Sequence, residues 1–169
     1  MVEVAPGDLE ALAAYAREAA ARGDVPATSG NFSLRKGPEG FVVSASGVDK
    51  KALSNHDFLS VNLDGASVHA SETRRPSAET LLHAAVYRGR PEANCVLHLH
   101  PLAVVRASMQ AAPVIRLTGL ELLKALEGID THEATVELPV FDNTQDMREL
   151  ATQVAHWLTD AGPGSHAFL

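Results

Sequence analysis

The chain has 169 residues and a formal net charge of −7, with 46% hydrophobic and 21% charged residues. This length suits one domain with a sizeable core, and the acidic balance argues against non-specific binding to nucleic acid or to an anionic membrane. The sequence has one cysteine, no apolar run of about 18 residues and no signal-peptide core. We therefore expect a protein of a reducing compartment, the cytoplasm, with no membrane partner.

The N-terminal half predicts one helix followed by short strands. Residues 8–22 are rich in alanine and carry apolar side chains near helical spacing. Asp8 and Gly23 are expected to cap this helix. Strands are expected at residues 32–34, 41–45 and 58–62, separated by turns that contain glycine.

The second half alternates helices and strands. The predicted elements are a helix from after Ser77 to about residue 90, a strand over 95–100, a helix after Pro101, a short helix over 119–126, a strand over 136–141 and a helix over 144–159. Residues 167–169 look like the start of a further strand. Strands with interspersed helices predict an α/β sandwich with a mixed sheet.

Two histidines on one predicted strand carry the clearest chemical signal. Residues i and i+2 of a strand point to the same face, so His98 and His100 can aim two imidazoles at one point. Neutral imidazole is a common ligand of divalent metals, and a catalytic zinc site often has three protein ligands and one open position. The alternative is a pair of buried strand histidines that satisfy each other.

Further polar side chains could extend this site. Glu79 and His83 lie four residues apart on the predicted helix that precedes the histidine strand, so they share a face. Glu79 is a third metal ligand, a general base, or a first-turn glutamate stabilised by the helix dipole. His83 is a packed helix residue or a ligand. Glu121 could move a proton if it lies beside a metal, but taken alone it is a surface helix residue.

Small-residue turns predict an anion site. Ser29-Gly30-Asn31 and Ser46-Gly47 each lie at the edge of a strand, and Ser77 precedes a helix N-terminus. Turns and helix starts of this kind present backbone N–H groups to a phosphate. The residues expected to bind the phosphate of a small substrate are Asn31, Ser46, Gly47, Ser77 and Lys50. The alternative is that these are ordinary loops.

These pieces together resemble the class II aldolase and adducin family, and within it the bacterial methylthioribulose-1-phosphate dehydratase branch. The matching stretches are ATSGNFSLR (27–35), SASGVDK (44–50), RPSAETLLHAAVY (75–87), VLHLHP (96–101), GLELLKALEG (119–128), THE (131–133) and PVFDNTQDM (139–147). The Pro-Ser-Ala-Glu segment and the His-x-His pair indicate the broad family. The ELLK, TH and FDNTQD segments favour the dehydratase branch.

The resemblance implies an α/β fold with a central, mainly antiparallel sheet flanked by helices, in a single domain over residues 1–169. It implies one zinc ion per subunit, held by three histidines of which the first two map to His98 and His100. The third family histidine lies in an Arg-Gly-His-Gly segment that would follow Leu169, so we expect the chain to lack the family's C-terminal segment. Family members are usually homotetramers with active sites near subunit interfaces.

The resemblance also implies the reaction, which is metal-dependent dehydration of 5-methylthioribulose 1-phosphate to the 2,3-diketo-5-methylthiopentyl 1-phosphate in methionine salvage. Glu121 matches the acid/base carboxylate of the dehydratases and Glu79 that of the aldolases, so both are expected to be catalytic, with Glu121 dominant. The expected partners are this sugar phosphate and further copies of the chain. Two alternatives stay open: a sugar-phosphate class II aldolase, and a non-catalytic module like the adducin head domain.

Overall fold

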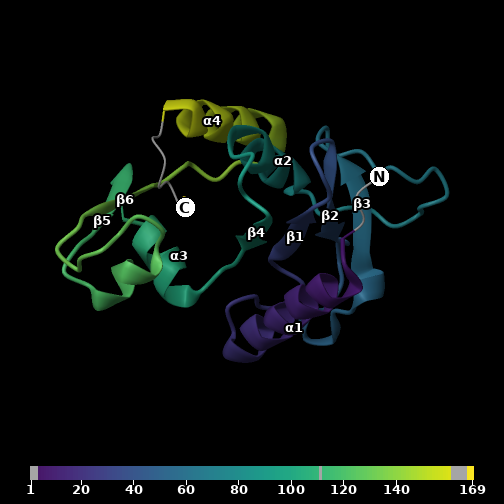
Figure 1. Cartoon of the computed structure of the whole chain (residues 1–169), viewed down its shortest axis with the longest axis horizontal. Coiled ribbons are helices and arrows are strands. Elements are labelled where there is room, and N and C mark those ends of the chain that lie inside the picture. Colours follow the sequence, from purple (N-terminus) through teal and green to yellow (C-terminus); the bar gives the residue numbers. More distant parts are fainter. Residues whose placement is uncertain (1–3, 111, 161–166) are drawn as a thin grey trace.

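A four-stranded sheet lies at the centre of the computed structural model, which describes residues 4–110, 112–160 and 167–169. Its strands run in the order β3-β2-β1-β4 (Figure 1). They are β1 Asn31–Arg35, β2 Gly40–Ser44, β3 Phe58–Asn62 and β4 Cys95–His98. Every strand pair in the described part of the chain is antiparallel. The mainly antiparallel sheet is thus confirmed, and the mixed sheet expected from the alternation of elements is wrong.

The helices follow the predicted order with shifted ends. They are α1 Pro6–Arg22, α2 Thr80–Gly89, α3 Leu102–Ser108 and α4 Met147–Asp160, with short 3₁₀ helices η1 Lys50–Ala52, η2 Asn55–Asp57 and η3 Glu121–Ala125. The expected cap at Asp8 is wrong, because Ala5 is the N-cap of α1 and Pro6 fills the first turn, where a missing N–H costs nothing. Gly23 closes the helix in the left-handed conformation with φ +83°, as expected.

Opposite faces of the sheet pack against different helices, because successive strand residues point to alternate sides. Phe32 and Val42 are buried beneath α1, whereas Phe41 and Val43 are buried beneath α2. Figure 1 shows α1 and α2 separated by β1 and β2. The cluster under α1 comprises Leu12, Ala13, Ala16, Ala19, Ala20, Val25, Phe32, Val42, Leu53 and Phe58. The cluster under α2 comprises Phe41, Val43, Val61, Ala84 and Tyr87.

Helix α4 covers the outer side of α2 and completes the core there. Leu150, Val154 and Leu158 are buried and pack with Ala85 of α2. Met147 and Trp157 pack at the margin of this cluster. The apolar stripe predicted for this helix is therefore confirmed. None of the helices in the described ranges is long and apolar enough to span a membrane.

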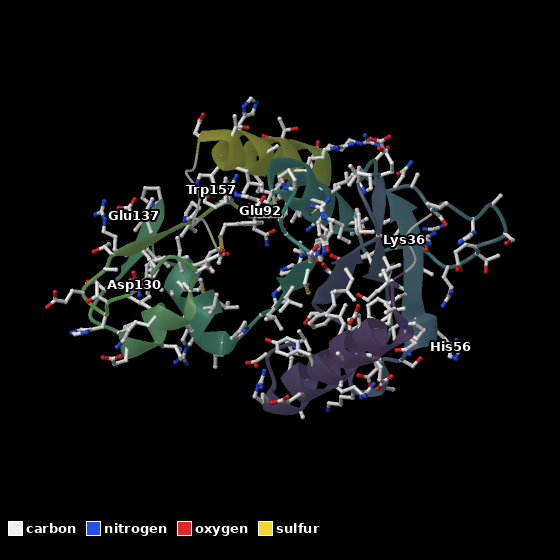
Figure 2. The ribbon with its side chains drawn as sticks, viewed as in Figure 1. Lys36, His56, Glu92, Asp130, Glu137 and Trp157 are labelled. Carbon is white, nitrogen blue, oxygen red and sulfur yellow. The ribbon has the colours of Figure 1, made fainter. Side chains whose placement is uncertain are left out.

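A second, two-stranded sheet lies at the other end of the molecule and pairs β5 Val114–Leu117 with β6 Val136–Pro139. In Figure 2 Asp130 and Glu137 mark this end, far from His56. Strand β5 was not predicted. The N–H of Leu169 donates to the carbonyl of Pro139 at 2.9 Å, so the last described residues extend the backbone pairing of this lobe.

Candidate active site

A cavity of about 270 Å³ lies at the end of the central sheet where β1 begins and where β2 and β4 end. It is lined by Thr28, Ser29, Gly30, Asn31, Ala45, Ser46, Gly47, Lys50, Ser77, Glu79 and His100. All five residues predicted to bind phosphate line this one cavity, together with one of the two predicted carboxylates and one of the two predicted histidines. Turns that are distant in sequence therefore line the same cavity.

Two of these turns are joined by backbone pairing. Ala45 forms a bridge with Pro76, and the N–H of Ser46 donates to the carbonyl of Arg75 at 2.9 Å. This pairing brings the turn after β2 next to Ser77 at the entrance of α2. Ser46 and Ser77 thereby line the same cavity.

Gly30 lies where only glycine fits. Its φ is +73°, a conformation that side chains with a Cβ rarely adopt. A Cβ at this position would stand 2.4 Å from Cγ1 of Val25 and 2.8 Å from the carbonyl oxygen of His98. The turn before β1 can therefore lie directly against the end of β4, which sets Asn31 beside His98.

Lys50 connects two of the turns through hydrogen bonds. Its side chain is only 1% exposed, and its Nζ donates to the carbonyls of Thr28 at 3.1 Å and Val48 at 2.9 Å. Burial lowers the pKa of Lys50 from its ordinary value. The ammonium thus links the turn before β1 to the turn after β2 and brings a positive charge to the cavity that Lys50 lines.

Ser29 is a site residue that the sequence interpretation missed. Its Oγ is buried and has no hydrogen-bond partner in the described part of the chain, although Ser29 lines the cavity. Buried hydroxyls are almost always paired, so an orphaned one is a place where a ligand oxygen would complete the bonding. The sequence could have identified Ser29, because the Ser29-Gly30-Asn31 turn to which it belongs was already expected to face a phosphate.

The two predicted histidines lie close together, although the strand expected over 95–100 ends at His98 and leaves His100 just beyond β4. The ring centroids of His98 and His100 lie 4.6 Å apart. Nδ1 of His98 lies 2.8 Å from Oε2 of Glu79, and this hydrogen bond lowers the pKa of Glu79 to about 2. Because a carboxylate only accepts, Nδ1 of His98 is the donor in this bond, and Nε2 is the ring nitrogen left for a metal. Burial lowers the pKa of His100, which favours its neutral, metal-binding form.

The donor chemistry fits a divalent metal in part. Two neighbouring imidazoles, one backed by a carboxylate, are the donors that zinc prefers. In the ranges that the structure describes, no group of three or more His, Cys, Asp or Glu is arranged to hold a metal ion. His98 and His100 therefore supply two ligands, and their assignment stays a prediction.

Glu121 lies elsewhere. It begins η3, its side chain is 72% exposed, and its Oε2 lies 2.5 Å from Nζ of Lys124. Its Oε1 lies 3.6 Å from Nδ1 of His132. It is not among the residues that line the cavity, so the described chain brings Glu79, and not Glu121, next to the histidine pair.

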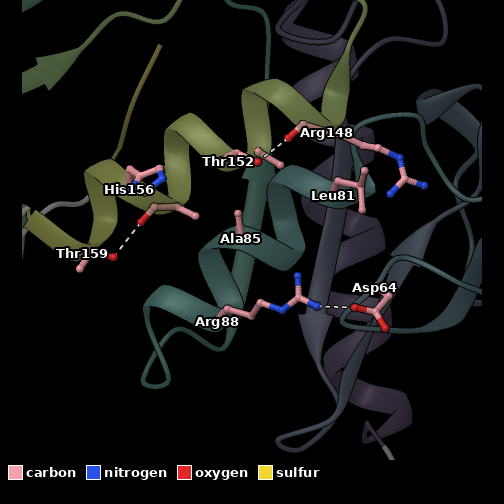
Figure 3. A pocket seen from close by; sticks show the side chains of 10 residues that line it. Asp64, Leu81, Ala85, Arg88, Arg148, Thr152, His156 and Thr159 are labelled. Carbon is pink, nitrogen blue, oxygen red and sulfur yellow. Dashed lines mark hydrogen bonds and ion pairs between the residues drawn. The ribbon is translucent and has the colours of Figure 1, made fainter.

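A larger groove of about 500 Å³ lies between α2 and α4 and contains none of the predicted site residues (Figure 3). Its floor is formed by small and apolar side chains such as Ala85 and Leu81. At its rim Arg88 is paired with Asp64 at 2.5 Å. The groove is thus separate from the turns and histidines of the smaller cavity.

Comparison with known proteins places these residues in context. Residues 10–169 match the family described as the class II aldolase and adducin N-terminal domain. The methylthioribulose-1-phosphate dehydratase of Xanthomonas oryzae pv. oryzae (strain PXO99A) is 50% identical over 145 residues, which is 85% of this chain. That of Enterobacter sp. (strain 638) is 44% identical over 150 residues, or 88% of this chain. The chain spans 64% of the length of the Xanthomonas protein and 72% of the Enterobacter protein.

Solved structures resemble the fold. The L-fuculose-1-phosphate aldolase of Thermus thermophilus superposes with a TM-score of 0.67 at 30% identity and covers 92% of this chain, which covers 73% of that one. YgbL of Klebsiella pneumoniae superposes with a TM-score of 0.74 at 20% identity, over 93% of this chain and 73% of YgbL. At that identity the second likeness concerns the fold alone.

Proposed function

The chain belongs to the class II aldolase and adducin family, and from that premise we propose that it forms the active site of a methylthioribulose-1-phosphate dehydratase, a hydro-lyase. The names of relatives at 44% and 50% identity support this reaction over that of the sugar-phosphate aldolases. The observation that carries the proposal is the single cavity in which the phosphate turns, Glu79 and His100 meet. Because the chain spans 64% of the Xanthomonas relative, the activity of the whole protein is part of the proposal.

The proposed reaction removes water from 5-methylthioribulose 1-phosphate. The proton on C3 goes to a base, the C4 hydroxyl leaves as water after gaining a proton, and the resulting enol ketonises to the 2,3-diketone. All five carbons and the phosphate stay together. The site must therefore hold the phosphate, stabilise negative charge near C2 and C3, and place an acid/base beside C3 and C4.

The phosphate is proposed to bind in the turns. Asn31, Ser46 and Ser77 offer side-chain donors, and Gly47 leaves its turn open to the ligand. The unpaired hydroxyl of Ser29 joins them. The buried ammonium of Lys50 lies beneath and adds positive charge to the floor, which favours a phosphate.

His98 and His100 are the proposed holders of one zinc ion per subunit, with Glu79 orienting the ring of His98. When bound there, such an ion supplies Lewis acidity to the carbonyl end of the substrate. The chain's own contribution is to hold the two imidazole rings side by side, with centroids 4.6 Å apart, and to bind the substrate phosphate in the neighbouring cavity.

Proton transfer is proposed for two carboxylates, with Glu121 as the principal acid/base and Glu79 as the secondary one. What supports Glu121 is the match of its segment to the dehydratase branch, and its exposed carboxylate beside Lys124 and His132. What supports Glu79 is its place in the cavity wall beside His98. The two proposals differ in which substitution abolishes turnover, which a direct experiment can decide.

We also propose a homotetramer that acts in the cytoplasm in methionine salvage. Support for an oligomer comes from large apolar side chains that the single chain leaves exposed around β4, α3 and η3. They are Leu97, Leu102, Val104, Met109, Leu120 and Leu122. An interface between subunits would cover such exposed apolar side chains. Strand β4 is also the edge of the described sheet and offers unpaired backbone groups.

Turnover of 5-methylthioribulose 1-phosphate tests the proposed function. Release of water and a five-carbon diketone phosphate would support the dehydratase. Formation of dihydroxyacetone phosphate from the same substrate would instead indicate cleavage of the C3–C4 bond and an aldolase. In a protein that also carries the third histidine, absence of zinc and of turnover would favour the non-catalytic module, for which neither the histidine pair nor the anion cavity has a use.

A further inference from the structure

A buried chain of hydrogen bonds connects the core to the candidate site. Tyr87 Oη lies 2.8 Å from Ser33 Oγ, and Ser33 Oγ lies 2.6 Å from Nδ1 of His83. Nε2 of His83 lies 2.5 Å from Oδ1 of Asn31, and Nδ2 of Asn31 donates to Oε2 of Glu79. The first four of these residues are at most 2% exposed, so solvent does not substitute for these partners.

The carboxylate of Glu79, at the end of this series of hydrogen bonds, determines which atom donates in each bond. A carboxylate of Glu79 accepts only, so Asn31 must turn its NH₂ group toward Glu79 and its oxygen toward His83. The oxygen of Asn31 also accepts only, so Nε2 of His83 must carry the ring proton. Nδ1 of His83 then accepts from the hydroxyl of Ser33, whose oxygen in turn accepts from Tyr87.

We propose that His83 is a positioning residue that locks the amide of Asn31, so that this side chain presents only N–H groups to Glu79 and to the cavity. The consequence for phosphate binding rests on the proposed function. A flipped amide would turn a carbonyl oxygen toward the carboxylate and toward the bound anion, and both contacts would be repulsive. Ser33 and Tyr87 act one step further back, by keeping Nδ1 of His83 an acceptor.

The burial of His83 supports this role. Desolvation lowers its pKa to about 3, so the ring is neutral and has a single N–H at ordinary pH. With the oxygen of Asn31 facing it, a neutral imidazole can satisfy Asn31 and Ser33 together only with the proton on Nε2. A histidine that merely fills space in the core would place no such condition on its tautomer.

Nitrogen-15 NMR of the wild-type chain tests the direction without any assay of activity. We expect Nε2 of His83 to show the chemical shift of a protonated ring nitrogen, and Nδ1 that of an unprotonated acceptor. The reverse assignment would overturn the proposal, because Asn31 would then have to turn its oxygen toward Glu79. This measurement stands whether or not the protein proves to be a dehydratase.

Two variants then test the consequence with inorganic phosphate as the probe, measured by calorimetry. His83→Gln keeps a donor toward Asn31 and an acceptor toward Ser33, so its phosphate affinity should stay within about threefold of wild type. His83→Leu removes both and should lose about tenfold or more, as expected when a hydrogen bond to a charged group is lost.

The possible outcomes distinguish a wrong role for His83 from a wrong assignment of the anion site. A folded His83→Leu chain that binds phosphate like wild type, or a folded His83→Gln chain that is as weak as His83→Leu, would overturn the positioning role. Absence of phosphate binding by the wild-type chain would count against the proposed anion site instead. In that case the His83 tautomer alone decides whether the amide of Asn31 is locked.

Discussion

Nδ1 of His98 and Oε2 of Glu79 lie 2.8 Å apart, so the end of β4 and the start of α2 meet in one hydrogen bond. The same oxygen of Glu79 accepts from the amide of Asn31. One carboxylate thus orients both an expected metal ligand and an expected phosphate ligand. The hydrogen bond from His98 lowers the pKa of Glu79 to about 2, so the carboxylate is ionised in both contacts.

Removing the charge of this carboxylate is therefore expected to weaken zinc binding. Glu79→Gln should lower zinc affinity by roughly 10–100-fold, because the carboxylate partner of a ligand histidine sets its tautomer and basicity. His98→Ala, which removes the ligand itself, should lose at least as much. Competition with a chromogenic chelator measures both. His156→Ala on the exposed side of α4 is the control, and equal zinc affinity in Glu79→Gln and wild type would contradict the prediction.

Lys50 is predicted to hold the two phosphate turns together. Lys50→Met keeps most of the side-chain volume but leaves the carbonyls of Thr28 and Val48 without their donor. A hydrogen bond from a charged donor contributes about 1.5–3 kcal/mol, so the free energy of unfolding should fall by about that amount. Urea denaturation measures the loss. Lys51→Met is the matched control, because Lys51 lies next along η1 and is exposed.

Gly30 is predicted to tolerate no side chain. In Gly30→Ala the strain of a positive φ, about 1–3 kcal/mol, is added to the clash with Val25 and with the carbonyl of His98. Gly23→Ala has a similar φ of +83° but meets no atom within 4 Å, so the difference between the two variants isolates the clash. Equal losses of thermal stability would show that the turn before β1 can move away from β4.

The alternation of residues in the sequence was enough to predict part of this site. The period of two in a strand predicted that His98 and His100 would be neighbours, and their ring centroids do lie 4.6 Å apart, although β4 ends at His98. The small-residue turns, each singled out by its composition, do line one cavity, and their binding of an anion stays a prediction. The sequence likewise located α1, α4 and the first three strands to within a few residues.

Other features depend on tertiary contacts that no local pattern encodes. The hydrogen bond between Glu79 and His98 requires the packing of α2 against the sheet. The short segment Val114–Leu117 becomes β5 only by pairing with β6, about 20 residues later in the chain. Lys50 was expected to add its charge to the phosphate site. Its ammonium also donates to two backbone carbonyls, an arrangement that its neighbours in sequence do not reveal.

Stability is predicted to fall below pH 6.5 through His83. Its pKa is about 3 in the folded chain and near 6.5 when unfolded, so between these values the unfolded state binds more protons and stability decreases as the pH falls. From pH 7.5 to pH 5 this site alone should cost about 2 kcal/mol. Urea denaturation of wild type and His83→Gln at both pH values isolates the effect, since the remaining titratable groups are common to both. Equal losses in the two proteins would show that His83 protonates in the folded state.

The ranking of the two carboxylates is the prediction that bears most directly on the reaction. Gln matches Glu in shape but cannot take up a proton as a base. Glu121→Gln should therefore lower kcat for dehydration by about 10²–10⁴-fold, as loss of a positioned acid/base does, while the fold stays intact. Glu79→Gln should cost less in kcat.

Control measurements show whether a loss of turnover reports proton transfer. Glu137→Gln removes an exposed carboxylate that pairs with Arg116 on the same lobe, and should leave kcat unchanged. Thermal unfolding and zinc content of each variant separate chemistry from folding and metal loss. Glu79 lines the cavity and Glu121 does not, so dominance of Glu79 with Glu121 nearly silent would assign proton transfer to the cavity wall and favour an aldolase-like site. Dominance of Glu121 would instead require the lobe that carries η3, of this chain or of a second copy, to reach the cavity during turnover.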